Sequence, residues 1–182
     1  MLEGLWHRGK EPLALLVVPP LPDDGGMDHV AAAELAFQAA SAGFPSLRFN
    51  FRGVGASQGP RDAAAALEDA RAALELAREN HTGRVAIAGI GSGCGVASKL
   101  SLEASVAGCL LVAPAQIDVW PAKVWVLVAS AETRLAGLDE AVRAAGGRCE
   151  DVETDRSFQR NLPQVGRIAV GWLTEAARAG KH

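Results

Sequence analysis

A serine between two glycines is the first candidate for chemistry in this sequence. Residues 55–59 read GASQG and match G-x-S-x-G, the pattern that surrounds the nucleophile of many serine hydrolases. There the serine lies on a sharp turn where a strand passes directly into a helix, which exposes its hydroxyl. Ser57 does not meet this requirement, because the preceding apolar run ends near Phe51 and the next helical pattern starts only after residues 59–61. We therefore expect Ser57 to be a loop residue.

The elements that must position a site are short apolar runs alternating with longer helical patterns. Runs that are apolar on both faces are typical of strands covered by helices on each side. Their regular alternation predicts an α/β fold with a doubly wound, mostly parallel sheet of about six or seven strands. The expected strands are 13–18, 47–51, 85–88, 108–113, 124–129 and 148–152, with 2–6 as an additional edge strand. The expected helices are 30–42, 62–80, 93–102, 138–145 and 165–179.

Composition and charge narrow the class of protein. The 182 residues are 49% hydrophobic and 21% charged, which predicts one globular domain over residues 1–182. A net charge of -3 gives no electrostatic reason to expect nucleic acid or an anionic membrane as partner. The apolar runs are shorter than a membrane span and the first residues lack a signal-peptide core, so we expect a soluble, cytoplasmic protein. The three cysteines show no CxxC spacing, and we expect neither a metal nor a cofactor.

A second glycine-rich stretch lies where a ligand is expected. In a doubly wound sheet, ligands bind outside the carboxyl ends of the strands. Residues 89–95 read GIGSGCG, directly after the strand expected at 85–88. The stretch is neither G-x-G-x-x-G nor a Walker A loop, since Cys94 takes the last glycine position and Lys99 lies far along the helix. Two interpretations remain: an anion-binding turn at a helix N-terminus, or a tight strand–helix crossing without a ligand.

Two segments resemble a known family. Residues 47–59, LRFNFRGVGASQG, resemble the strand and loop of the small, lidless bacterial α/β-hydrolases, a group described as esterases or dipeptidyl-peptidase-like serine hydrolases. Residues 19–26, PPLPDDGG, resemble the family's H-P-x-P-x-x-G-G with proline in place of the histidine. The resemblance extends from about residue 13 to the C-terminal helix. It implies a minimal α/β-hydrolase fold without a lid.

The resemblance also implies where a catalytic triad would lie. The family places G-x-S-x-G directly after the strand matched by 85–88, which puts Gly91 at the nucleophile position and Ser92 at a backbone oxyanion donor. Glu132 matches the acid position, with Asp118 as another acid position in this fold, and Arg156 stands where the family has its histidine. Glycine has no attacking side chain, and arginine cannot accept a proton near neutral pH. The resemblance thus predicts a degenerate triad.

Three functions follow as hypotheses. The favoured one is a catalytically degenerate protein that binds a small, anionic ligand or a protein partner. An atypical carboxylester or thioester hydrolase is the alternative, with Ser92 as nucleophile and His29, the one histidine near the expected pocket rim, as base. The third is a structural subunit whose exposed faces mediate assembly, and a homo-oligomer is left open. The candidate ligand-binding residues are Gly91, Ser92, Gly93, Arg52 and Arg156.

Overall fold

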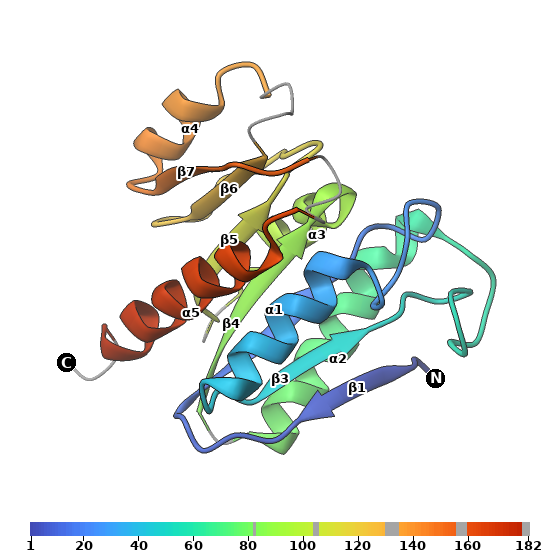
Figure 1. The fold of residues 1–182 in the computed structure, drawn as a ribbon. Helices are drawn as coiled ribbons and strands as arrows, with labels where there is room; N and C mark the ends of the chain where they lie inside the picture. Colours follow the sequence, from blue (N-terminus) through green and yellow to red (C-terminus); the bar gives the residue numbers. More distant parts are fainter. Residues whose placement is uncertain (82, 104–105, 130–134, 156–159, 180–182) are drawn as a thin grey trace.

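A seven-stranded sheet forms the centre of the molecule (Figure 1). The computed structural model describes residues 1–81, 83–103, 106–129, 135–155 and 160–179. The strand order is β1-β3-β2-β4-β5-β6-β7; β1 pairs with β3 antiparallel and the other neighbours pair parallel. The strands are β1 Gly4–His7, β2 Leu13–Val18, β3 Ser46–Phe49, β4 Arg84–Ile90, β5 Val106–Val112, β6 Trp125–Ala129 and β7 Arg148–Val152. The expected mostly parallel α/β sheet is confirmed.

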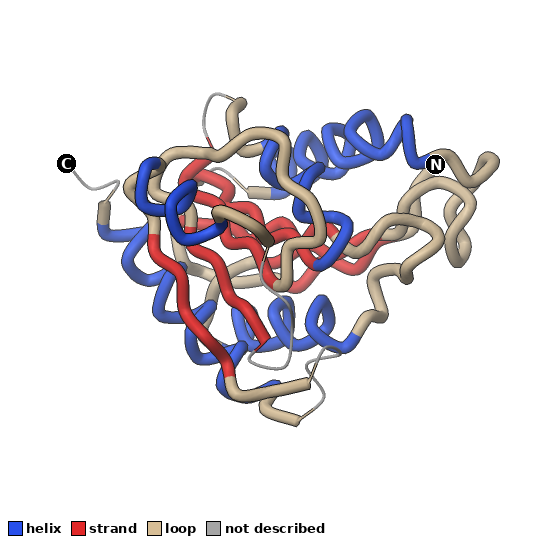
Figure 2. Tube along the Cα trace, turned by 90° about the horizontal axis from the view of Figure 1, so that it is seen from above, coloured by secondary structure: helices blue, strands red, loops and turns tan. Residues whose placement is uncertain are grey.

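Helices cover both faces of this sheet, as the view from above also shows (Figure 2). Side chains of α1 and α5 share one apolar cluster, and those of α2, α3 and α4 share another. The helices are α1 Val30–Ser41, α2 Ala66–Asn80, α3 Cys94–Leu100, α4 Leu138–Ala144 and α5 Leu162–Arg178, with short 3₁₀ turns η1 Ala63–Ala65 and η2 Gly91–Gly93. Within the described residues, no helix is long and apolar enough to cross a membrane.

Alternation along β2 explains why its run is continuously apolar. Leu13, Leu15 and Val17 pack into the cluster beneath α1 and α5, whereas Leu16 and Val18 pack on the other side. Successive side chains of a strand point to opposite faces, so a strand covered by helices twice needs apolar residues at every position. This arrangement fixes β2 and its neighbour β4 at the middle of the sheet, and it directs their carboxyl ends to one edge.

Candidate functional site

The turn after β4 has the geometry of a nucleophile position. Ile90 ends the strand in an extended conformation, with φ −127° and ψ 130°. Gly91 follows with φ +54°, and the chain then enters η2 and α3 without an intervening loop. β4 lies between β2 and β5, so the turn stands at the centre of the carboxyl edge. An abrupt strand-to-helix turn of this kind holds the catalytic serine in α/β-hydrolases.

The three glycines of this turn are there for different reasons. A Cβ on Gly93 would collide with the backbone of Pro19, and one on Gly89 would lie 2.5 Å from the Cβ of Ala97. These two glycines therefore allow close packing of the turn against its surroundings. A Cβ on Gly91 would have no atom within 4 Å. Gly91 therefore has the backbone conformation expected at a nucleophile position and faces open space, but it has no side chain that could attack a substrate.

The loop after β2 has little capacity left to stabilise an oxyanion. In α/β-hydrolases the oxyanion hole combines the N–H after the nucleophile with an N–H from the neighbouring strand–helix loop. Pro19, Pro20 and Pro22 carry no N–H. The remaining N–H of this segment, on Leu21, donates to the Ser92 hydroxyl oxygen over 3.0 Å. Residues 19–22 therefore offer no unoccupied donor.

Ser92 and His29 each have a structural partner. The Ser92 hydroxyl holds the loop after β2 through Leu21, as described above. His29 is the N-cap of α1, where its Nδ1 accepts the N–H of Ala31 over 3.3 Å, and burial lowers its pKa. In the part of the chain that the structure describes, no hydrogen bond joins Ser92 to His29. The two residues of the alternative mechanism are thus not assembled as nucleophile and base.

Arg52 does not face the turn after β4 as a free cation. Its side chain forms hydrogen bonds to Asp69 over 2.9 and 2.7 Å and to Glu68 over 2.8 Å, both on α2. Its backbone N–H also donates to the second oxygen of Asp69 over 2.9 Å. The Asp69 side chain is only 4% exposed, so this pair compensates a buried carboxylate. Arg52 is therefore a structural residue of the β3–α2 connection and does not support an anionic ligand.

Of the acid and base positions, only Asp118 lies within the described residues. Glu132 and Arg156 lie outside the described residues. Asp118, the other acid position, forms an ion pair with Lys99 over 2.6 Å, and that hydrogen bond lowers its pKa. Gln116 donates a second hydrogen bond to the same carboxylate over 3.2 Å. Asp118 therefore has cationic and amide partners on the surface of the α3 region.

Ser57 lies in a loop, as expected from its distance to the strand. Its side chain is buried, accepts the N–H of Glu3 over 2.9 Å and donates to the carbonyl of Asn50 over 2.8 Å. Glu3 and Asn50 extend the network, because the Glu3 carboxylate accepts Asn50 Nδ2 over 2.7 Å and the N–H of Ala56 over 2.8 Å. The sequence gives no signal for this role of Glu3, which lies about fifty residues away. Ser57 of this G-x-S-x-G pattern therefore links the N-terminal segment to the loop after β3 by hydrogen bonds.

Among the described residues, no group of three or more histidines, cysteines, aspartates and glutamates lies close enough to hold a metal ion.

Ala113, which follows β5 beside the turn, has a positive φ of 49° although it is not glycine. Such a conformation costs about 1–2 kcal/mol. Ala113 is thus a strained residue close to the turn that contains Gly91.

Comparison with solved structures gives the same fold. No protein-family model and no curated protein matches the sequence. A serine hydrolase without a lid from Xanthomonas campestris superposes with a TM-score of 0.82 at 22% identity, covering 98% of this chain and 88% of that one. An α/β serine hydrolase homologue from Coxiella burnetii gives 0.77 at 22% identity, covering 94% and 91%. A Pyrococcus furiosus esterase gives 0.79 at 12% identity, covering 96% and 87%. The chain therefore has the α/β-hydrolase fold in its small form without a lid, and it carries glycine at the elbow after β4.

Proposed function

We propose that this protein is a catalytically degenerate α/β-hydrolase-like protein that acts by binding a small ligand or a protein partner. The observation that carries the proposal is the turn after β4. It keeps the sharp strand-to-helix geometry, but Gly91 supplies no nucleophile. Loss of a triad nucleophile lowers the rate by several orders of magnitude and leaves only residual binding effects.

The surroundings of Gly91 support the same conclusion independently. A vacant nucleophile position with an intact oxyanion hole would retain donors on both sides of the turn. Here the loop after β2 has prolines at 19, 20 and 22, and the N–H of Leu21 is used by Ser92. Two parts of the catalytic machinery are thus changed together. Both features, the glycine at position 91 and the prolines of the loop after β2, are compatible with a packed turn, so a protein that only binds could keep them.

Labelling with a fluorophosphonate probe tests the proposal. We expect no adduct on the folded protein by intact mass, beside an active α/β-hydrolase labelled under the same conditions. A stoichiometric adduct mapped to Ser92 would establish the alternative, an atypical ester or thioester hydrolase. Gly91→Ser is the matched variant, since position 91 has room for a side chain. We expect it to fold and remain unlabelled, because a hydroxyl alone brings neither a base nor a second oxyanion donor.

Ligand binding is tested by thermal shift. A ligand that binds only the folded state raises its stability by RT ln(1 + [L]/Kd), about 2.7 kcal/mol at a hundred times Kd. We expect a stabilising compound from a panel of small carboxylates, esters and amides to lose its effect when a tryptophan is placed at position 91, where the open space would be filled. A shift that survives Gly91→Trp would place the binding site elsewhere.

A further inference from the structure

His29 lies where the loop after β2 passes into helix α1. Its ring is half-buried, and its Nδ1 accepts the N–H of Ala31 over 3.3 Å. Its backbone N–H donates to the Gly26 carbonyl over 3.0 Å, and its own carbonyl accepts the N–H of Ala33 over 3.0 Å. A Cβ on Gly25 would lie 4.0 Å from His29 Cδ2, so the ring lies close to that part of the loop. His29 thus joins the loop after β2 to the first turn of α1.

Other contacts that hold this loop do not change charge near neutral pH. Met27 donates its N–H to Asn50 Oδ1 over 2.7 Å, and an amide side chain does not titrate. Arg48 donates to the Met27 carbonyl over 2.8 Å, and a guanidinium stays charged in proteins. Histidine is the side chain whose charge ordinarily changes between about pH 5 and 8. Of these contacts, only the cap made by His29 can therefore respond to pH in that range.

A proton on Nδ1 of His29 is incompatible with the cap of α1. The neutral ring offers a lone pair to the N–H of Ala31, whereas an imidazolium is a donor at both nitrogens. The charged ring would also place a positive charge at the N-terminus of α1, where the helix dipole is itself positive. The first turn of α1 has no acidic side chain to offset that charge. Both effects favour departure of the charged ring from the cap.

The charged side chains on the elements around this ring are partly paired with one another. Among the described residues of the neighbouring loops, of α1, of β3 and of the first half of α5, they are Asp23, Asp24, Asp28, Glu34, Arg48, Arg61, Asp155, Arg160 and Arg167. Asp28 forms an ion pair with Arg48 over 2.8 Å, and its side chain is 80% exposed. Arg167 lies beside Ser41 at the opposite end of α1. Burial lowers the pKa of His29, and among the described residues no charged side chain contributes to this shift.

We propose that His29 is a pH-sensitive switch between the loop after β2 and helix α1. With a neutral ring, Nδ1 caps the helix and the ring lies near Gly25. With a protonated ring, the cap is broken, the ring turns to solvent and the N–H of Ala31 is left to water. The same loop packs at Pro19 against Gly93, so the change takes place at the carboxyl edge of the sheet. The switch goes beyond the proposed function and does not depend on it, because the cap forms whether or not position 91 is catalytic.

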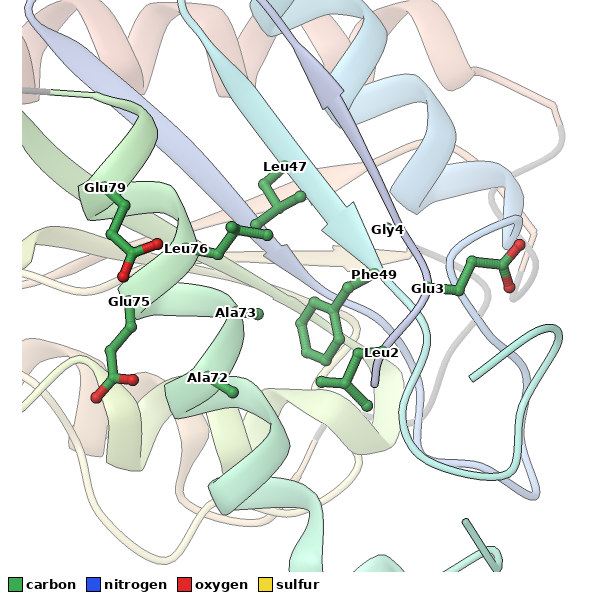
Figure 3. Close-up of a pocket in the computed structure, with 10 residues that line it drawn as sticks. All are labelled: Leu2, Glu3, Gly4, Leu47, Phe49, Ala72, Ala73, Glu75, Leu76 and Glu79. Carbon is green, nitrogen blue, oxygen red and sulfur yellow. The ribbon is translucent and has the colours of Figure 1, made fainter. Parts of the chain in front are cut away.

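The direction of the pH dependence follows from the lowered pKa of His29. A histidine whose pKa is lower in the folded state stabilises the fold above its ordinary value of about 6.5, and this contribution is lost as the pH falls through the folded pKa. The carboxyls of Glu3 and Asp118 have lowered pKa values and stay charged in this range. Figure 3 shows the Glu3 carboxylate pointing away from the apolar hollow between β1 and α2, and Asn50 binds it over 2.7 Å. Their titration is therefore separate from that of His29.

Histidine NMR combined with amide exchange is the first test. We expect the His29 ring resonance to titrate with a midpoint below about pH 6.5. The protection factor of the Ala31 amide should fall with the same midpoint by about fivefold, the factor that a typical N-cap contributes. Met27, bound to Asn50, is the internal reference and should keep its protection between about pH 8 and 5. Constant protection at Ala31, a midpoint different from that of the ring, or an equal loss at Met27 overturns the proposal.

Two variants at position 29 separate titration from capping. Asparagine is a strong N-cap without a charge to gain, so in His29→Asn the protection at Ala31 should stay high and no longer change with pH. His29→Ala has no acceptor and should show the low protection of the acidic wild type at every pH. His7→Asn on β1 is the matched control and should leave the pH dependence at Ala31 intact. A pH dependence that persists in His29→Asn, or that disappears in His7→Asn, contradicts the assignment to His29.

Discussion

The turns that follow β3 and β4 lie at the same edge of the sheet, yet each has what the other lacks. The turn after β3 carries the G-x-S-x-G pattern, and its Ser57 is buried in a structural hydrogen-bond network. The turn after β4 has the strand-to-helix geometry of a nucleophile, and its Gly91 has no side chain. The G-x-S-x-G motif and the strand-to-helix turn that normally carries it can therefore occur at different places in one fold. Only the geometry of the turn identifies the site.

The two turns also differ in what stabilises them. The turn after β3 is secured by polar side chains: Arg52 on Asp69, and Ser57 on the backbone of the N-terminal segment. The turn after β4 is stabilised by close backbone packing at Gly93 and by hydrogen bonds from Leu21 N–H to the Ser92 hydroxyl and from Ala115 N–H to the Gly91 carbonyl. Substitutions in the two turns should accordingly act through different physical causes.

The largest effect is expected for Arg52→Ala. It removes the cation that compensates the buried Asp69 carboxylate, and a buried charge without a partner is the most destabilising of the changes compared here. The Arg52 side chain is itself 27% exposed, so water screens part of this loss. Urea denaturation measures the loss. Arg52→Ala with Asp69→Asn should recover most of the stability, and a single variant as stable as the wild type would show that Arg52 is free for another role.

The next effect contrasts two glycines of the turn after β4. Gly93→Ala should destabilise by about 3 kcal/mol, because its Cβ meets the backbone of Pro19 and overpacking costs up to that amount. Gly91→Ala has open space and pays only for its left-handed backbone, about 1–2 kcal/mol. Denaturation midpoints of the two variants make the comparison. Equal losses would mean that position 91 is not open.

A smaller difference is expected between the two serines. Ser57→Ala leaves the N–H of Glu3 and the carbonyl of Asn50 without their partner and should cost about 1–3 kcal/mol. Ser92→Ala removes one acceptor, from Leu21, and should cost about 1 kcal/mol. Neither should change reactivity toward a fluorophosphonate. Loss of a measurable esterase activity in Ser92→Ala alone would reverse the assignment of the two turns.

The smallest effect is a pH dependence confined to the turn after β3. Hydrogen bonds from Ala56 and Asn50 lower the pKa of Glu3 below its ordinary value. A carboxyl whose pKa is lower in the folded state stabilises the fold above its unfolded pKa, and this contribution is lost as the pH falls through the folded pKa. Amide exchange at Ala56 should therefore lose protection as the pH falls through the lowered pKa of Glu3. In Glu3→Gln the protection should no longer change with pH; an unchanged acid dependence there would exclude Glu3 as its origin.

The sequence predicts local elements better than contacts between distant segments. The strands 13–18 and 148–152 match residue for residue, because their ends are marked by Pro12, Pro19 and the glycines before Arg148. The strand expected at 47–51 ends at Phe49 instead. Asn50 leaves the expected strand, and its side chain binds the N–H of Met27 and the carboxylate of Glu3.

The candidate site shows the same limit. The turn at Gly91 can be predicted from the sequence, because a strand followed at once by closely spaced glycines is a local pattern. The bond between Leu21 and Ser92 joins segments 71 residues apart, and no local pattern encodes it. Arg52 was expected near the ligand, but it turns to Asp69, because a buried carboxylate on α2 needs a cation and Arg52 is within reach. Whether Arg52 binds a ligand or the Asp69 carboxylate depends on contacts that exist only in the folded protein.

The glycine at position 91 also has a thermodynamic consequence. An active enzyme must hold its serine in a left-handed backbone conformation that costs a side-chain-bearing residue about 1–2 kcal/mol. Glycine adopts φ +54° without that cost, so the turn after β4 is relaxed here. Under the proposed function, loss of the nucleophile and a gain in stability are then the same event. A lineage that no longer needs the reaction would keep such a glycine through the selection for folding alone.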